Sequence, residues 1–427
     1  MSLTRTTLLN GMATGTRLAS ALILNKLLAV YVGPAGFGMI GQFHSLMSLI
    51  SAAAGGVFSS GVTKLTAQHA GAAEVQLAVW RTALTLGLVG AGVGSLSLLL
   101  FGPFLATQLL ADATLSSAVF WLAAATGFLA VNTVLLAALS GLKKVEAFVA
   151  ASIAGSFVSA GVATLLVLKF GLYGGLIAIP IGQALCGVVT ALFFQKVLRC
   201  RWRDLVGRLN AQASRGLGGF AVMAATTAIV VPLSHIVIRD GLTRMAGADM
   251  AGVWQAMWKL SETHLLLLTT TLSLHFLPRF SEIMVGSELR REVAKAYLFV
   301  LPLVGATAIC IYLLREPLIL MLISPAFLPL SQALGWQLLG DVLKIGSWVP
   351  AFTMISHARV RLYVATECGF SLLVAVACLV GFRHFGLPGA GAGYAATYAL
   401  YWAMSQWQLV RLAGQLNAAP GATRIAN

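Results

Sequence analysis

The chain has 427 residues, of which 59% are hydrophobic and only 10% are charged. Together with a mean hydropathy of +0.89, this composition excludes a soluble globular domain and predicts an integral membrane protein. The formal net charge of +15 does not indicate nucleic-acid binding. Most Lys and Arg residues stand beside apolar runs, where they set membrane topology and meet anionic lipid headgroups.

Twelve apolar runs are long enough to cross a membrane as helices, which takes roughly 20 residues each. They lie at 7–32, 38–62, 79–101, 115–140, 147–168, 174–198, 217–238, 256–277, 296–315, 333–355, 362–382 and 389–411. The runs are long and do not alternate, whereas a membrane-spanning barrel shows short alternating strands. We therefore predict an all-α integral membrane protein with twelve transmembrane helices.

The hydrophobic pattern repeats at about half of the chain length. The segment Phe-Gly-Leu-Tyr-Gly at 170–174 returns as Phe-Gly-Leu-Pro-Gly at 385–389, and a basic turn at 140–144 has a counterpart at 356–359. Internal repeats of this kind are typical of transporters. We predict an N-terminal bundle of six helices over 1–200, a basic cytoplasmic linker over 201–216 and a C-terminal bundle of six helices over 217–427.

The basic residues also predict the orientation of the chain. Positively charged connections are retained on the cytoplasmic side of a membrane. If the N-terminus is cytoplasmic, the cytoplasmic connections hold most of the 28 basic residues, with many of them in the linker. Both termini are then cytoplasmic, and the even number of helices in each copy makes the two bundles parallel repeats.

Loop lengths argue against an enzyme. The longest non-cytoplasmic connection, at about 239–255, is too short to fold into a domain, and the sequence contains no nucleotide-binding P-loop. The missing P-loop excludes an ATP-driven pump for this chain alone. A membrane enzyme of glycan assembly is expected to carry a large extracytoplasmic loop with catalytic Arg or His residues. We predict a transporter with neither a cofactor nor a metal site.

Charged side chains inside the apolar runs are the strongest candidates for a site, because a charge within a membrane is expensive. The basic candidates are Arg17, Lys26, Lys259 and Lys344. For Lys26, a place in a cavity and snorkelling to the membrane surface both stay open. Lys259 and Glu262 are three residues apart, as are Asp341 and Lys344, so each pair shares a helical face. Each pair is either a self-neutralised ion pair or part of a proton, sodium or ligand-exchange site.

Further polar groups extend this set, and cations outnumber acids among the groups with a path to the membrane centre. Candidate polar or coupling residues are Glu367, Gln42 and Gln255, with Asn132, Gln183 and Gln337 as weaker ones; His44, His235, His264 and His275 can titrate but are more often packing residues. We expect a cationic central cavity between the bundles that suits phosphate or pyrophosphate, because basic side chains form charge-assisted hydrogen bonds with their oxygens.

Several motifs resemble those of flippases for lipid-linked oligosaccharides in the multidrug/oligosaccharidyl-lipid/polysaccharide (MOP) exporter superfamily. In the first two helices they are Met-Ser-Leu at 1–3, Lys-Leu-Leu-Ala-Val at 26–30, Gly-Pro-Ala-Gly at 33–36 and Gly-Val-Thr-Lys at 61–64, followed by Ala67 and Gln68. The segment at 336–344, Trp-Gln-Leu-Leu-Gly-Asp-Val-Leu-Lys, is similar to the tenth helix of the enterobacterial common antigen branch. The similarity extends over essentially the whole chain.

This resemblance implies a V-shaped fold of two six-helix bundles. It also implies translocation of an undecaprenyl-pyrophosphate-linked oligosaccharide, such as lipid III or an O-antigen unit, from the inner to the outer leaflet of a bacterial inner membrane by alternating access. Family members bind the pyrophosphate through basic cavity residues, and the matching positions here are Arg17 and Lys26, with Asp341 and Lys344 in the tenth helix. Relatives can carry Lys at position 17. A glycan polymerase, a chain-length regulator, and protons or sodium are candidate partners.

Other interpretations remain open at this stage. A multidrug antiporter of the same superfamily would be expected to have an acid-lined cavity for cationic drugs, whereas this chain has only 13 acidic residues, mostly in loops. A membrane enzyme of glycan assembly lacks support from the loop lengths. A flippase for the peptidoglycan precursor usually brings two further helices.

Overall fold

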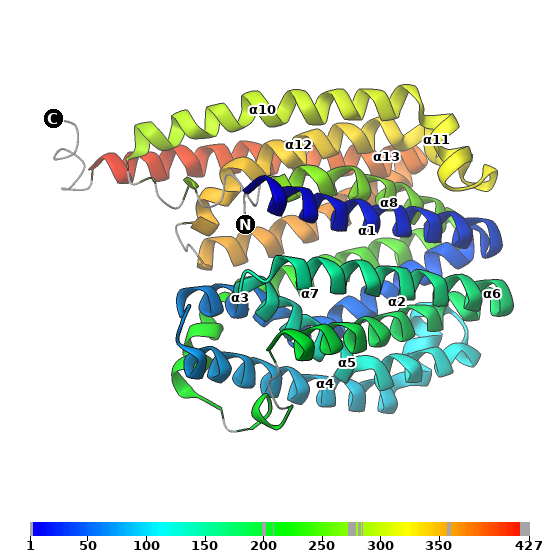
Figure 1. Ribbon diagram of the computed structural model, residues 1–427. Helices are drawn as coiled ribbons and strands as arrows, with labels where there is room; N and C mark the ends of the chain where they lie inside the picture. The colour runs from blue at the N-terminus through cyan, green and yellow to red at the C-terminus, as the bar shows by residue number, and fades with distance from the viewer. Residues whose placement is uncertain are drawn as a thin grey trace. The chain divides into compact units, whose positions relative to one another are not determined.

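The computed structural model describes residues 3–198, 202–207, 209–271, 279–280, 283, 285–356 and 360–418. All regular structure within these residues is helical (Figure 1). The predicted all-α fold is confirmed.

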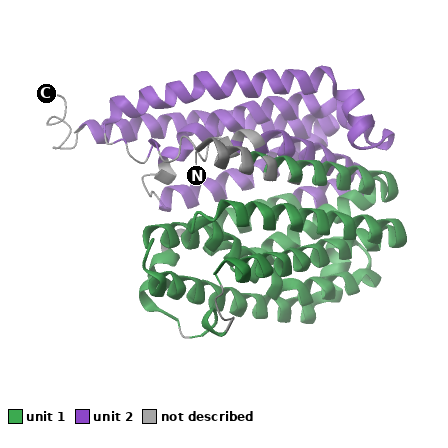
Figure 2. Cartoon of the chain, in the orientation of Figure 1, with its two compact units in different colours: residues 1–236 green, residues 237–427 purple. Residues whose placement is uncertain are grey.

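The chain divides into two compact units, residues 1–236 and 237–427 (Figure 2). The helices of the first unit are α1 (Leu3–Tyr31), α2 (Gly33–Ala53), α3 (Ser59–Gln68), α4 (Ala73–Leu110), α5 (Ser116–Gly141) and α6 (Val145–Leu198), with single 3₁₀ turns at Gly56–Phe58, Ala113–Leu115 and Trp202–Asp204. Helix α7 (Ala211–Ala246) begins in this unit and ends in the second. The grouping into two six-helix bundles joined by a linker at 201–216 stays a prediction.

The second unit continues with α8 (Ala248–Thr271), α10 (Gly286–Leu313), α11 (Arg315–Leu322), α12 (Ser331–Ser356) and α13 (Val360–Ala418), and a 3₁₀ segment at Pro325–Leu330 precedes α12. Its core lies where α8, α10, α12 and α13 pack together. Phe280, Leu289 and Val349 are buried there. In the first unit, Trp80, Val134 and Phe194 lie in the core, and the Trp80 ring meets Phe194 edge to face.

Within the part of the chain that the structure describes, six helical segments are long and apolar enough to cross a membrane, and a seventh arises if α2 and α3, bent by 59° at a short break, form one span. Two of the six are α6 and α13, each of which contains two of the predicted spans. Helices α1, α8 and α12 are of spanning length but are not among the segments that pass. Each carries charged residues within its length, which lower its hydropathy.

The repeated glycine motif marks the same break in α6 and α13. Gly171 (φ 55°) interrupts α6 and Gly386 (φ 63°) interrupts α13. A positive φ is readily adopted only by glycine. Three residues later, a Cβ on Gly174 would lie 1.9 Å from the Leu166 carbonyl oxygen, and one on Gly389 would lie 2.0 Å from that of Gly381. Both motifs therefore join two closely packed helices, as the internal repeat predicts.

Large apolar side chains cover the outer faces of the long helices. On α4, Val93, Leu96, Leu100 and Phe104 are each more than half exposed and follow one another at intervals of three or four residues. Such a spacing places them on one face of the helix. A continuous apolar face is costly in water and fits contact with lipid.

Candidate functional site

The buried carboxylate of Asp341, on α12, is the centre of a hydrogen-bonded network within the second unit. Asp341 is fully buried. Its Oδ1 accepts hydrogen bonds from the Ser261 hydroxyl of α8 and from the Tyr394 hydroxyl of α13, the latter at 3.0 Å. The Gln337 side-chain amide, one turn before Asp341, donates to Ser261 Oγ at 3.3 Å. Three helices therefore meet at one acidic group, whose burial is compensated by these donors.

A histidine extends the network to α10. His264 Nδ1 lies 3.4 Å from Asp341 Oδ2, and its Nε2 lies 2.9 Å from Thr307 Oγ1. The side chains of His264 and Asp341 are only 4% and 0% exposed. The imidazole therefore bridges the Asp341 carboxylate of α12 and the Thr307 hydroxyl of α10.

Lys344 lies in a cage of aromatic rings. Its Nζ is 5.2 Å from the ring centre of Trp258, 5.3 Å from that of Trp348, 5.8 Å from that of Tyr394 and 5.2 Å from that of Tyr398. An ammonium within about 6 Å of an aromatic face is attracted by the ring electrons. The four rings therefore contribute to the environment of the Lys344 ammonium group.

The predicted pair of Asp341 and Lys344 is therefore not an ion pair in this structure. Of the two alternatives left open for this pair, the self-neutralised ion pair does not form, because the spacing of three residues fixes only a shared face. Donors from α8 and α13 bind the carboxylate, and aromatic rings surround the ammonium group. The pair of Lys259 and Glu262 does form, with 3.1 Å between Nζ and Oε2. Glu262 also accepts a hydrogen bond from Trp258 Nε1 at 2.9 Å. The pair is partly exposed, with 32% and 47% of the side chains accessible.

The other predicted site residues lie on several helices. Arg17 and Lys26 are on α1, where Lys26 is partly buried and the Arg17 side chain lies outside the described part of the structure. On α2, Gln42 is buried and donates to the Ile236 carbonyl at 3.4 Å. Glu367 is partly buried on the first half of α13.

Gln255 accepts a hydrogen bond from Arg239 instead of standing alone as a cavity amide. The sequence had placed Arg239 in a connection after the seventh helix, but α7 continues to Ala246 and leaves Arg239 only 2% exposed. This is a correction to the predicted end of that helix. A buried guanidinium requires acceptors, and the Gln255 side chain supplies one.

The weaker candidates are divided between the two units. Asn132 and Gln183 line a pocket within unit 1, and Gln337 joins the Asp341 network. Among the histidines, His44 is exposed and His235 is buried, while His275 lies outside the described residues. No group of three or more His, Cys, Asp or Glu side chains that fits a metal ion occurs among the described residues.

The aromatic part of the site was not predicted from the sequence. Trp254 and Trp258 stack at 5.5 Å, and Trp258 meets Tyr394 edge to face at 5.3 Å. The signal was present in the spacing, since Tyr394 and Tyr398 are four residues apart, as are Trp254 and Trp258. Residues four apart lie on one helical face. The sequence does not show, however, that these faces of α8 and α13 surround the same lysine of α12.

Comparison with solved structures defines the class of fold. A multidrug resistance MATE family transporter of the MOP superfamily in an inward-facing conformation shares the fold at a TM-score of 0.72 and 14% identity, over 93% of this chain and 98% of that one. A MOP superfamily transporter from Pyrococcus furiosus, described as having a binding pocket of reverse polarity that suggests a different function, aligns at a TM-score of 0.70 and 15% identity over 94% of both chains. The chain is a multi-pass membrane protein with the MOP transporter fold.

Sequence comparison narrows this class. The chain is 29% identical over 410 residues to proteins named Lipid III flippase from Escherichia coli (strain K12) and Shigella flexneri, covering 95% of this chain and 97% of each relative. No protein-family model matches the chain. The resemblance expected from the motifs is confirmed.

Proposed function

We propose that this protein is a flippase that moves an undecaprenyl-pyrophosphate-linked oligosaccharide, lipid III or a related O-antigen unit, from the cytoplasmic to the periplasmic leaflet by alternating access. The observation that carries the proposal is the similarity to proteins named Lipid III flippase over 95% of this chain. Similarity at that length covers both units. The membrane is the bacterial inner membrane, and both termini are cytoplasmic.

The chemistry of the charged groups supports an anionic head group. Lys259 and Lys344 are basic side chains of unit 2 that retain partial exposure, and we assign Arg17 and Lys26 to the pyrophosphate in unit 1. Lysine and arginine form charge-assisted hydrogen bonds with phosphate oxygens. When the pyrophosphate leaves, Glu262 competes for Lys259 through the ion pair that the structure contains.

The Asp341 network supports a role in coupling. Asp341 and His264 are buried and adjacent. In this proposal, a proton bound to either group changes the hydrogen bonds that the Asp341 carboxylate accepts. We assign this pair to a proton-linked step and leave sodium as the alternative ion. Glu367, Gln42 and Gln255 contribute polarity rather than charge exchange. A glycan polymerase and a chain-length regulator are the partners that would use the product.

The multidrug alternative has weaker support. The MATE family transporter of known structure shares 14% identity with this chain, which establishes the fold and nothing about the ligand. A pocket for cationic drugs favours exposed acids. In unit 2, Asp341 is fully buried behind Ser261 and Tyr394, and the exposed Glu262 carboxylate is paired with Lys259.

Reconstituted translocation tests the proposal. Purified protein in proteoliposomes is given a fluorescent undecaprenyl-pyrophosphate-linked oligosaccharide, and the fraction protected from a membrane-impermeant quencher is followed. The unmodified protein should equilibrate the lipid between leaflets, and Arg17→Ala and Lys26→Ala should slow this at least tenfold. Arg291→Ala and Lys144→Ala, which remove exposed basic side chains, serve as matched controls and should retain the rate. Full activity of both α1 variants would remove the pyrophosphate role from α1.

A further inference from the structure

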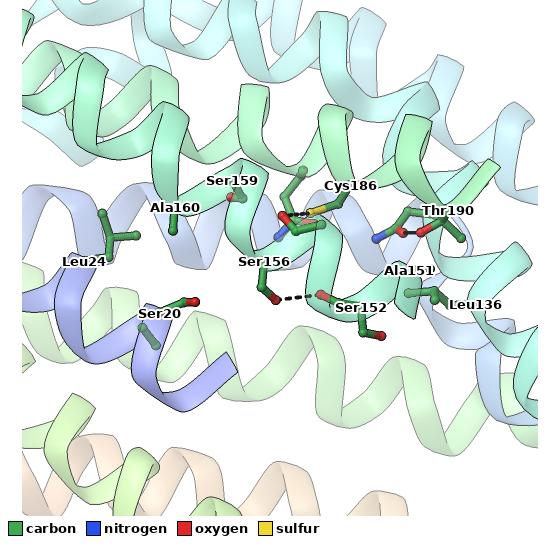
Figure 3. Close-up of a pocket in the computed structure, with 14 residues that line it drawn as sticks. Ser20, Leu24, Leu136, Ala151, Ser152, Ser156, Ser159, Ala160, Cys186 and Thr190 are labelled. Atoms are coloured by element: carbon green, nitrogen blue, oxygen red, sulfur yellow. Dashed lines mark hydrogen bonds between the residues drawn. The ribbon is translucent and has the colours of Figure 1, made fainter. Parts of the chain in front are cut away.

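A polar pocket of about 330 Å³ lies within unit 1 among α1, α5 and the two halves of α6 (Figure 3). None of its 14 lining residues is charged. The polar side chains used in the argument are Ser20, Asn132, Ser156, Ser159, Gln183 and Thr190. The pocket therefore differs in chemistry from the cations assigned to pyrophosphate and from the charged network of unit 2.

Several of these polar groups have hydrogen-bonding capacity to spare. Thr190 donates to Asn132 Oδ1 at 2.7 Å, and the NH₂ group of the Asn132 side chain, which lines the pocket, carries two further donors. Within the described residues, Ser20, Ser159 and Gln183 form no side-chain hydrogen bond. Covering such groups with an apolar ligand costs free energy, because each polar atom is then left without a hydrogen-bond partner.

The combination of hydroxyls and amides without charge selects a class of ligand. A phosphate group binds best where arginine or lysine is present, and the pocket lining has neither. A neutral sugar offers both donors and acceptors around its ring, and it matches the mixed donors and acceptors of Ser, Asn and Gln side chains. Pockets for small molecules are typically about 300–1,000 Å³. At about 30 Å³ per water molecule, the unit 1 pocket has room for about as many water molecules as a hexose has non-hydrogen atoms. The pocket is therefore about the size of one monosaccharide.

The position of the pocket on α1 indicates which sugar is bound. Ser20 lies three residues after Arg17 on the same helix, about 4.5 Å along its axis. Residues at this spacing lie on one helical face. A head group that places its pyrophosphate at Arg17 brings the sugar bonded directly to that pyrophosphate nearest to Ser20.

We infer that the unit 1 pocket is a recognition site for the neutral sugar attached directly to the pyrophosphate of the lipid-linked substrate. The inference rests on the proposed function and adds that two parts of the site bind different parts of the same head group. Basic residues of α1 hold the charge, and the pocket lined by Gln183, Ser159 and Asn132 recognises the first sugar.

Equilibrium binding to the protein in nanodiscs separates the two contributions. The probes are a polyprenyl pyrophosphate without sugar and the same lipid carrying one neutral monosaccharide, either glucose, galactose or N-acetylglucosamine. Gln183→Leu removes the amide, and Ser159→Ala is a second, smaller change in the same pocket. Each should weaken the preferred sugar-bearing lipid about fivefold to tenfold while changing the affinity for the sugar-free lipid less than twofold. Lys26→Ala should weaken both lipids.

The controls make the outcome decisive. Gln332→Leu changes an exposed glutamine of α12 and should leave both affinities unchanged. Equal weakening of both lipids by Gln183→Leu and Ser159→Ala, or no weakening of any sugar-bearing lipid, would overturn the inference and leave the proposed function standing. If the unmodified protein binds neither lipid, the proposed function itself fails, and the inference fails with it.

Discussion

Removing the Ser261 hydroxyl should destabilise the second unit far more than removing another buried serine hydroxyl. Ser261 is 3% exposed, donates to the Asp341 carboxylate and accepts from Gln337. Loss of a hydrogen bond to a charged group costs about 1.5–3 kcal/mol, and the unpaired Gln337 amide adds about 1 kcal/mol. Ser261→Ala should therefore lower the free energy of unfolding by about 2.5–4 kcal/mol.

Ser405 provides the matched control for this substitution. It is 1% exposed and its hydroxyl donates to the Trp402 carbonyl of its own helix at 3.0 Å. That carbonyl already has a helical partner, so Ser405→Ala should cost less than about 1 kcal/mol.

The assay is the apparent unfolding temperature of the purified protein in detergent at one fixed heating rate, because membrane proteins of this size often unfold irreversibly. For a unit of this length, about 1 kcal/mol corresponds to roughly 2–4 °C. The expected decrease is about 5–16 °C for Ser261→Ala and under about 4 °C for Ser405→Ala. Equal decreases would refute the view that the Asp341 network holds α8 against α12.

Three further predictions concern the repeat, a loop carboxylate and the caged lysine. Gly171→Ala, at a backbone with φ of 55°, should destabilise by about 1–2 kcal/mol, whereas Gly161→Ala, in a helical position with open space around it, should be neutral or stabilising in the same thermal assay. Hydrogen bonds from the side chain and then the backbone of Thr114 lower the pKa of Asp112 below its usual 3.8. The contribution of these bonds to folding stability is therefore present above that pH and is lost as the pH falls through the folded-state pKa. Asp112→Asn should make thermal stability less sensitive to acid between about pH 5 and 3. Lys344→Met keeps a flexible side chain among the aromatic rings but removes the charge. The translocation rate should fall at least tenfold, with a change of only a few degrees in unfolding temperature. An unchanged rate would exclude a role for that charge.

Much of the architecture could be predicted because it depends on local sequence. Long apolar runs predict membrane helices from burial alone. The repeated Phe-Gly-Leu motif predicted corresponding features in the two halves, and both glycines adopt the positive φ that breaks their helices. The break itself was recognised as a connection between spans in each case.

The site could be predicted only in part, because side-chain partners depend on helices far apart in sequence. Asp341 and Lys344 were found by their charge, but their partners Ser261, Tyr394 and Trp258 come from α8 and α13. Helical periodicity gives the face on which a residue lies, and it does not give the neighbour that packs against that face.

The unit 1 pocket shows the same limit in a different form. Ser152, Ser156 and Ser159 follow at intervals of four and three residues along α6, which is a recognisable polar stripe on one face. Single serines in membrane helices are common and often satisfy themselves by bonding to the preceding turn, as Ser156 does with the Ser152 carbonyl at 2.8 Å. Only the packing of α1 and α5 against α6 shows that the stripe lines a cavity.

The most direct test of the proposed function is a comparison of two cargoes in the same proteoliposomes. One is a fluorescent undecaprenyl-pyrophosphate-linked oligosaccharide and the other is a cationic dye of the kind that multidrug antiporters move. We predict rapid redistribution of the lipid-linked oligosaccharide between leaflets and no dye transport under a proton or sodium gradient. Dye transport without movement of the lipid would contradict the proposal and assign the chain to the antiporters that share its fold.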